Sequence, residues 1–194
     1  MSNEEAAWNE RYASGSHVNS EPDPLLIKAY NDYILPLLPA KGTALDIAGG
    51  VGRNAIWLAA RGWRVTLVDV SDAGLAIATE RAKDLPITFV QQDLTLGIPP
   101  GSFDLILNFF YLERSLYGRI VSALAPGGLL IFKTYTRLHP ALSGGKGPTH
   151  PMHLLAPGEL LHEFEGLDVL YYRETVRDKG VAEVIARKPT ESLR

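Results

Sequence analysis

The sequence contains no cysteine, which excludes disulfide bonds, thiolate nucleophiles and zinc sites built on thiolates. Its N-terminus, MSNEEAAWNERYASGS, lacks the apolar centre of a signal peptide, and no apolar run is long enough to span a membrane. The 19 basic and 22 acidic side chains are spread along the chain, so there is no basic stripe for nucleic acid. These absences predict a soluble, cytoplasmic protein that binds neither nucleic acid nor a membrane.

Segments typical of strands and helices alternate along the chain. Runs rich in Val, Ile and Leu predict five strands, at 43–48, 63–70, 87–93, 102–110 and 129–136. Apolar residues at helical spacing predict helices at 24–38, 54–61, 72–84, 112–125 and 158–166, and Ser71 is a candidate N-cap. LDVLYYRETV and VAEVIARK, joined through DKG, predict a closing antiparallel hairpin.

This alternation predicts a single α/β domain of the doubly wound, Rossmann-like kind. Its seven-stranded sheet is expected to be mostly parallel, with the antiparallel hairpin at the C-terminal end. We expect an N-terminal arm or lid at 1–23, the ligand-binding domain at 24–189 and a short tail at 190–194. Residues 137–157 are rich in Gly, Pro and His, and a loop of this length predicts a lid or binding loop. We expect a monomer or weak dimer.

The stretch ALDIAGGVGRNA, residues 44–55, predicts a strand, a glycine turn and a helix N-terminus that cradle a small molecule. Gly50, Gly52 and Ala55 fit the dinucleotide pattern G-x-G-x-x-A, and Asp69 follows at the end of the next strand, where a carboxylate suits a ribose diol. Asp46 argues against a dinucleotide, because a carboxylate there repels a diphosphate and attracts an ammonium group.

Asp93 adds an acceptor for an exocyclic amine at the end of the third strand. A ligand with an ammonium group, a ribose and an adenine but no phosphate is S-adenosylmethionine. An NAD-binding oxidoreductase and a non-catalytic cofactor-binding module remain the alternatives.

Five motifs in order carry a family resemblance: DIAGGVGRN from Asp46, VDVS from Val68, QDL from Gln92, FDLI from Phe103 and LAPGG from Leu124. With these motifs, the sequence resembles a class I S-adenosylmethionine-dependent methyltransferase. The resemblance covers about Leu25 to Lys188. The WNERY start, the GRN triplet and HLLAPGEL are similar to the branch of tellurite-resistance and thiopurine methyltransferases.

The resemblance implies a role for each matching position. Asp46 would receive the methionine amino group, with the backbone of Gly49, Gly50 and Gly52 beside the methionine moiety. Asp69 would hold the ribose, Val70 would pack on the adenine, and Asp93 and the amide of Leu94 would bind it. The expected cofactor-binding set is Asp46, Ala48, Gly49, Gly50, Gly52, Asn54, Asp69, Val70, Asp93, Leu94, Asn108 and Phe109. Ala48 departs from the family, in which many members have glycine.

The acceptor site is less defined by the sequence. The resemblance implies that Asn108 and Phe109 lie beside the transferable methyl. The aromatic run that continues to Tyr111 either lines the acceptor site or belongs to the core. Trp8 and Tyr12 form either a lid over the cofactor or a hydrophobic clasp on the sheet edge. The residues expected toward the substrate or lid are Trp8, Tyr12, Arg53, Phe110, Lys146 and His153.

No general base is evident, although Tyr111, Tyr117, His150 and Glu113 are candidates. Because a thiol, selenol or reduced chalcogen loses its proton easily, the lack of a base favours a small acceptor of this kind. His150 and His153 are spaced like a metal-ligand pair, but no carboxylate or cysteine completes a site, so we expect no metal and predict that His153 orders its loop.

Overall fold

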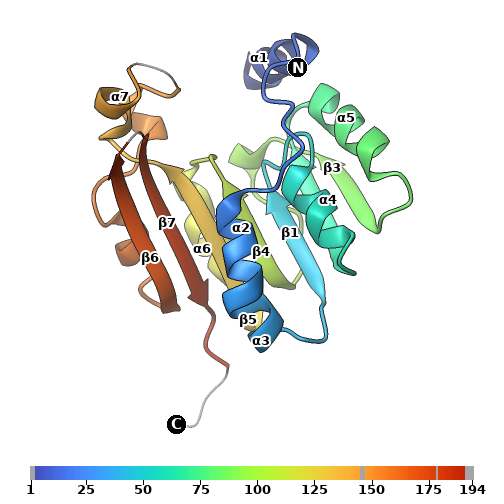
Figure 1. Ribbon diagram of the computed structural model, residues 1–194, viewed down its shortest axis with the longest axis vertical. Coiled ribbons are helices and arrows are strands. Elements are labelled where there is room, and N and C mark those ends of the chain that lie inside the picture. The colour runs from blue at the N-terminus through green and yellow to red at the C-terminus, as the bar shows by residue number, and fades with distance from the viewer. Residues whose placement is uncertain (1–2, 145–146, 178, 191–194) are drawn as a thin grey trace.

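The computed structural model describes residues 3–144, 147–177 and 179–190. A seven-stranded sheet in the order β3-β2-β1-β4-β5-β7-β6 runs through the molecule (Figure 1). β1 to β5 are mutually parallel where they pair, and β7 runs antiparallel to both β5 and β6. The strands are β1 Thr43–Ile47, β2 Arg64–Asp69, β3 Ile87–Gln91, β4 Phe103–Phe109, β5 Leu124–Tyr135, β6 Asp168–Arg177 and β7 Lys179–Arg187.

The strand order confirms the predicted α/β architecture with its antiparallel hairpin. β1 lies at the centre, and the chain leaves it first toward β2 and β3 and later toward β4 and β5. The order therefore reverses between β1 and β4, and ligands bind at such a reversal, beyond the carboxyl ends of the strands. Asp46, Asp69 and Phe109 lie at these ends.

Helices cover both faces of the sheet, because alternate residues of each buried strand point to opposite sides. On β4, Leu105 and Leu107 belong to the core beneath α2, α4 and α5, whereas Ile106 belongs to the core beneath α6 and α8. The helices of the two layers are α2 Pro24–Ala29, α3 Leu35–Leu37, α4 Arg53–Ala59, α5 Asp72–Ala82, α6 Tyr117–Ala123 and α8 Glu159–Glu163.

Three segments differ from the predictions. The expected helix at 24–38 contains a π-helical stretch, Tyr30–Ile34, between α2 and α3. The expected loop at 137–157 contains helix α7, His139–Leu142, and the 3-10 turn Pro151–His153. The APGG stretch that was expected to end a helix lies within β5, where the pairing with β4 shifts register and Gly127 takes a φ of 79°.

Shorter 3-10 turns complete the chain, at Leu94–Leu96 after β3 and at Arg114–Leu116 before α6. The predicted N-cap is confirmed, since Ser71 Oγ accepts the N–H of Gly74 at the start of α5. Within the described residues, no helix has both the length and the apolar character needed to cross a membrane.

Helix α1, Asn3–Ala13, packs on α5 near the carboxyl ends of the parallel strands (Figure 1). Asn9 Oδ1 accepts a hydrogen bond from Ser71 Oγ at 2.5 Å, which ties the helix to the start of α5. After α1 the chain crosses back toward α2, and Arg81 holds this crossing by donating to the carbonyl of Val18 at 2.8 Å. The N-terminal segment therefore lies over the predicted ligand site. The proposed boundary of the arm, 1–23, stays a prediction, and residues 191–194 of the proposed tail lie outside the described residues.

Candidate functional site

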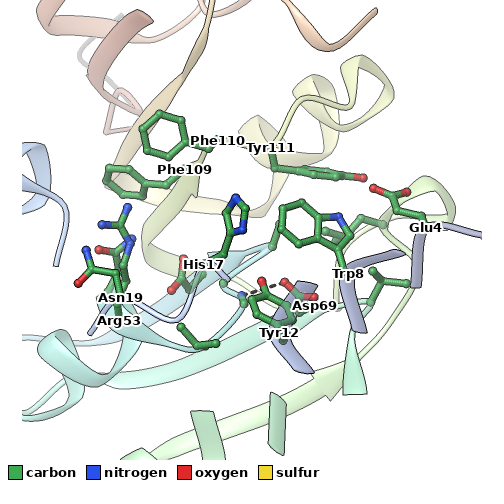
Figure 2. A pocket seen from close by; sticks show the side chains of 18 of the residues that line it. Glu4, Trp8, Tyr12, His17, Asn19, Arg53, Asp69, Phe109, Phe110 and Tyr111 are labelled. Atoms are coloured by element: carbon green, nitrogen blue, oxygen red, sulfur yellow. Dashed lines mark hydrogen bonds between the residues drawn. The ribbon is translucent and has the colours of Figure 1, made fainter. Parts of the chain in front are cut away.

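The glycine turn between β1 and α4 forms the floor of a pocket (Figure 2). Gly50 has a φ of 54°, and a Cβ on this residue would lie 2.4 Å from the hydroxyl oxygen of Tyr12. A side chain at this position would therefore fill the cradle. Ala48 has a φ of 52°, the left-handed region that favours glycine, which explains in physical terms why glycine suits this position.

Asp46 lies beneath this turn at the end of β1 and is 1% exposed. Its Oδ2 atom is buried without a hydrogen-bond partner, while the backbone N–H of Ala55 is bonded to the carboxyl group. Burial raises the pKa of Asp46 to about 7, against an opposing effect of the Arg53 guanidinium. Because an unpartnered buried carboxylate is costly, this atom is a strong acceptor for a cationic ligand group.

Asp69 ends β2 on the same side of the pocket and is 6% exposed. Its two oxygens accept backbone N–H groups, Oδ2 from Gly50 at 2.8 Å and Oδ1 from Ser71 at 2.9 Å. Burial raises the pKa of Asp69, and these backbone donors oppose the shift. A carboxylate has about four lone-pair positions, so both oxygens keep capacity for a diol. The backbone bonds thus fix the carboxylate toward the pocket.

Asp93 follows β3 and caps the short turn that begins at Leu94. Oδ1 accepts both the N–H and the hydroxyl of Thr95, at 2.9 and 2.7 Å, and these bonds lower the pKa of Asp93. Among the described residues, Oδ2 of Asp93 has no hydrogen-bond partner. This oxygen is therefore available to a donor on a ligand.

Helix α1 closes the pocket from above. Trp8 and Tyr12 stack with ring centroids 5.7 Å apart, and both line the cavity. Tyr12 is buried, and burial together with the charge of Asp69 raises its pKa. His17 follows the helix and meets Trp8 edge to face at 5.6 Å. Both aromatic side chains therefore face the pocket, and their role as a lid over a cofactor stays a prediction.

The end of β4 supplies the aromatic wall. Phe109, Phe110 and Tyr111 all line the pocket, and Phe110 takes a left-handed φ of 61°. Burial raises the pKa of Tyr111. Asn108 is buried and does not line the pocket, since its side chain donates to the carbonyl of Tyr111 at 2.8 Å. Asn108 thus shapes the wall from behind.

Arg53, the first residue of α4, borders the pocket and enters a buried ionic network. Its guanidinium lies 3.3 Å from Asp23, and Lys133 Nζ lies 3.0 Å from the other oxygen of Asp23. Lys133 also pairs with Glu183 at 3.2 Å. Arg53 is therefore held at one end of the pocket, beside the glycine turn.

The structure brings most of the predicted residues together around this pocket. Those that line it are Trp8, Tyr12, Asp46, Ala48, Gly49, Gly50, Arg53, Asn54, Asp69, Val70, Asp93, Leu94, Phe109, Phe110 and Tyr111. Sequence reasoning missed Glu4, His17, Asn19 and Val51. The spacing of Glu4, Trp8 and Tyr12 places all three on one face of a helix, so this pattern could have identified Glu4 as a pocket residue. His17 and Asn19 follow the helix in irregular structure, where no periodicity applies.

Other candidates lie elsewhere. Tyr117 is buried against Phe132 and Phe164, and its hydroxyl donates to Glu159 at 3.0 Å, so it belongs to the core beneath α6 and α8. Gly52 is the N-cap residue of α4, and a Cβ there would meet side chains of the core.

The two histidines of the predicted pair have ring centroids 6.0 Å apart and are exposed. Neither His150 nor His153 lines the pocket. His153 ends the 3-10 turn Pro151–His153, and His150 is the N-cap residue of that turn. In the described part of the chain, no three His, Asp or Glu side chains form a group able to hold a metal. Lys146 lies outside the described residues.

Comparisons with known proteins agree with this geometry. Residues 44–128 match the family model described as a methyltransferase domain. The protein YqeM of Bacillus subtilis (strain 168), provisionally named a methyltransferase, is 31% identical over 119 residues, which cover 55% of this chain and 48% of YqeM. The chain thus spans about half the length of the curated relatives that it matches.

Solved structures match almost the whole chain. TehB from Haemophilus influenzae superposes with a TM-score of 0.73 at 19% identity, over 93% of this chain and 67% of TehB. The N-methyltransferase NodS from Bradyrhizobium japonicum WM9, in complex with S-adenosyl-L-homocysteine, gives 0.70 at 21% identity, over 97% and 100%. At sequence identities of 19% and 21%, these matches show that the folds are alike. Residues 44–128 therefore carry the sequence of a methyltransferase domain, and the chain has the Rossmann-like methyltransferase fold.

Proposed function

We propose that this protein is an S-adenosylmethionine-dependent methyltransferase with a small-molecule acceptor, a thiol or related chalcogen compound. The observation that carries the proposal is the buried, unpartnered Oδ2 of Asp46 beside the glycine turn. An ammonium group satisfies this atom, whereas the diphosphate of a dinucleotide would meet a buried negative charge. The residues present fit the cofactor.

Each part of the cofactor has a partner in the pocket. Asp46 receives the methionine ammonium group, Asp69 the two ribose hydroxyls, and Oδ2 of Asp93 the adenine amine. Val70 and Leu94 border the adenine position. When bound, the cofactor supplies a methyl group that is already activated by a sulfonium centre.

The protein's own contribution is therefore to position the acceptor and exclude water. Alignment of this kind accounts for about 7–11 kcal/mol of a barrier in favourable systems. Trp8 and Tyr12 from above and Phe109 and Phe110 from the side supply apolar walls. These walls favour a small, soft acceptor over a large or highly charged one. The acceptor class and the likeness to TehB support placing the protein in the branch of tellurite-resistance and thiopurine methyltransferases.

Isothermal calorimetry tests the cofactor assignment. We expect S-adenosylhomocysteine to bind and NADH not to bind. Asp69→Asn is expected to weaken binding of S-adenosylhomocysteine by about 1–3 kcal/mol, since charge-assisted bonds to the ribose are lost. Asp72→Asn, an exposed neighbour on α5, is the matched control and should leave binding unchanged.

Binding of NADH in preference to S-adenosylhomocysteine would overturn the proposal in favour of an oxidoreductase. Binding of S-adenosylhomocysteine without methyl transfer to any acceptor would instead identify a non-catalytic cofactor-binding module. A panel of thiol, selenol, hydroxyl and amine acceptors, assayed by transfer of a labelled methyl group, tests the acceptor class. Transfer only to oxygen or nitrogen would contradict the thiol or chalcogen assignment.

A further inference from the structure

His17 is a titratable pocket residue to which the proposed cofactor binding gives no role. Its imidazole projects into the pocket on the side of Trp8 and Phe109 (Figure 2). The residue follows α1 with a left-handed φ of 62°, a conformation that is unusual for a side chain other than glycine or asparagine. Strained backbone of this kind is found at functional sites.

The loop around His17 is held by named contacts. The N–H of Ser16 donates to the carbonyl of Arg11 at 2.9 Å, and Arg81 holds the carbonyl of Val18. Ser16 Oγ lies 2.8 Å from Nδ1 of His17, and Trp8 contacts the ring edge to face. When Nδ1 donates to this hydroxyl, Nε2 carries the free lone pair. The ring is thus oriented with one nitrogen engaged and the other left for a ligand.

The other titratable groups of the pocket are unsuited to removing a proton from the acceptor. Asp46, Asp69 and Asp93 serve the cofactor in the proposed function, and Glu4 lies at the Asp93 end, where burial and then the Asp93 carboxylate raise the pKa of Glu4. The phenols of Tyr12 and Tyr111 have raised pKa values and stay protonated near neutral pH.

We infer that His17 is the general base of methyl transfer and that its substrate is a thiol whose own proton must be removed. This inference rests on the proposed function. The acceptor sulfur forms a bond to the methyl carbon, the bond between that carbon and the sulfonium sulfur breaks, and its electron pair stays on the departing sulfur. The proton of the acceptor thiol passes to Nε2 of His17. The products are a methyl thioether, S-adenosylhomocysteine and an imidazolium, which returns its proton to water.

This role predicts that the drop in transfer rate on replacing His17 depends on the acidity of the acceptor thiol. An alkyl thiol, largely protonated at neutral pH, needs the base, whereas an aryl thiol that is already ionised does not. His17→Asn preserves the left-handed backbone, because asparagine tolerates this conformation. We expect it to slow transfer to alkyl thiols about 100-fold and transfer to aryl thiols less than about 3-fold. His162→Gln, an exposed histidine of α8, is the control.

The pH dependence of the transfer rate has to be separated from the titration of Asp46, whose pKa is about 7. The charged and titratable groups that line the pocket together with His17 are Glu4, Tyr12, Asp46, Arg53, Asp69, Asp93 and Tyr111. Arg11 adds a cation over Trp8. At saturating cofactor, the ammonium group holds Asp46 ionised, so a remaining rise of the alkyl-thiol rate with pH is assigned to His17 when it depends on that side chain. The rise should vanish in His17→Asn.

Histidine NMR supplies a readout that is independent of turnover. In the dead-end complex with S-adenosylhomocysteine, the His17 ring signals should shift when an alkyl thiol is added, because the thiol lies beside Nε2, and the affinity for S-adenosylhomocysteine should be the same in His17→Asn and wild type. An equal loss for alkyl and aryl thiols, or no loss, would overturn the role of His17 while leaving the cofactor proposal intact. A wild-type protein that binds no S-adenosylhomocysteine, or that methylates no thiol, would overturn both.

Discussion

A single buried carboxylate, Asp46, links the stability of the protein to its ligand. Its pKa of about 7 lies above the usual value near 3.8 because burial disfavours the charged form. Between these two values the folded protein holds a proton that the unfolded chain has lost. Stability therefore falls as the pH rises through this window, by an amount on the order of 4 kcal/mol.

Cofactor binding is expected to show the opposite trend. Because an ammonium group requires the ionised carboxylate, affinity for S-adenosylhomocysteine should rise between pH 5.5 and 7, by up to about tenfold per pH unit. Asp46→Asn should flatten both profiles, as measured by urea unfolding and calorimetry across this range, and Asp32→Asn on the exposed helix surface should alter neither. Affinity that falls with rising pH would contradict the assignment of Asp46 to an ammonium group.

At the scale of single residues, the sequence indicates the strand-end carboxylates well. Asp46, Asp69 and Asp93 each interrupt or end an apolar run, and parallel strands bring their carboxyl ends to one edge. Tyr117 could not be distinguished in this way, since it lies on a helix face that packs against the core. His17 was missed because its position depends on how α1 docks, which no local pattern encodes.

Helix α1 is an element whose docking has a consequence for binding. Asn9 anchors the helix to the start of α5. Its Oδ1 atom accepts hydrogen bonds from Ser71 Oγ and, at 3.4 Å, from the N–H of Ala73. Asn9→Ala removes both bonds and should destabilise the docked helix by about 1 kcal/mol. We expect weaker binding of S-adenosylhomocysteine and faster proteolysis near 13–20, with the core of the domain intact.

Limited proteolysis followed by mass spectrometry measures this docking. The cofactor product should protect the 13–20 segment in the wild type and protect it less in Asn9→Ala. Glu10→Ala, an exposed change on the same helix, is the control. Equal cleavage of Asn9→Ala and wild type in the absence of ligand would show that Asn9 does not hold the helix.

The elements themselves were predicted more completely than their irregularities. Apolar runs predict β1 to β5, and they are nearly continuous in β1, β2 and β4, which are buried on both faces. The more exposed β6 is predicted, with β7, from the hairpin pattern. No local sequence pattern indicated the π-helical stretch at Tyr30–Ile34 or the register shift where β4 pairs with the start of β5. The short helix α7 occurs within a loop whose composition is typical of turns.

Across the whole molecule, one ionic network joins the segment before α2 to the antiparallel hairpin. Asp23 and Glu183, both nearly fully buried, share Lys133 between them, while Arg53 and Arg173 pair with their outer sides. The network spans α4, β5, β6 and β7 and so connects the pocket edge to the far strands. Its central cation holds two carboxylates that have little access to water.

Removal of this cation should therefore destabilise the fold strongly. Lys133→Met keeps the apolar stem but leaves Asp23 and Glu183 each with one cationic partner in the described structure, an arginine. We expect a loss of about 3 kcal/mol in urea unfolding. Lys28→Met breaks an exposed pair with Asp32 and should cost less than about 0.5 kcal/mol.

A double-mutant cycle identifies the cause of that loss. Adding Glu183→Gln to Lys133→Met removes one of the stranded charges, so the double variant should be more stable than the sum of the two single losses, by about 1–3 kcal/mol. Additive losses would instead assign the effect of Lys133→Met to side-chain packing against Phe110, whose ring the ammonium group approaches at 5.4 Å. A coupling energy between Lys133 and Glu183 would show that charge joins the hairpin to the rest of the domain, and its absence would show that packing does.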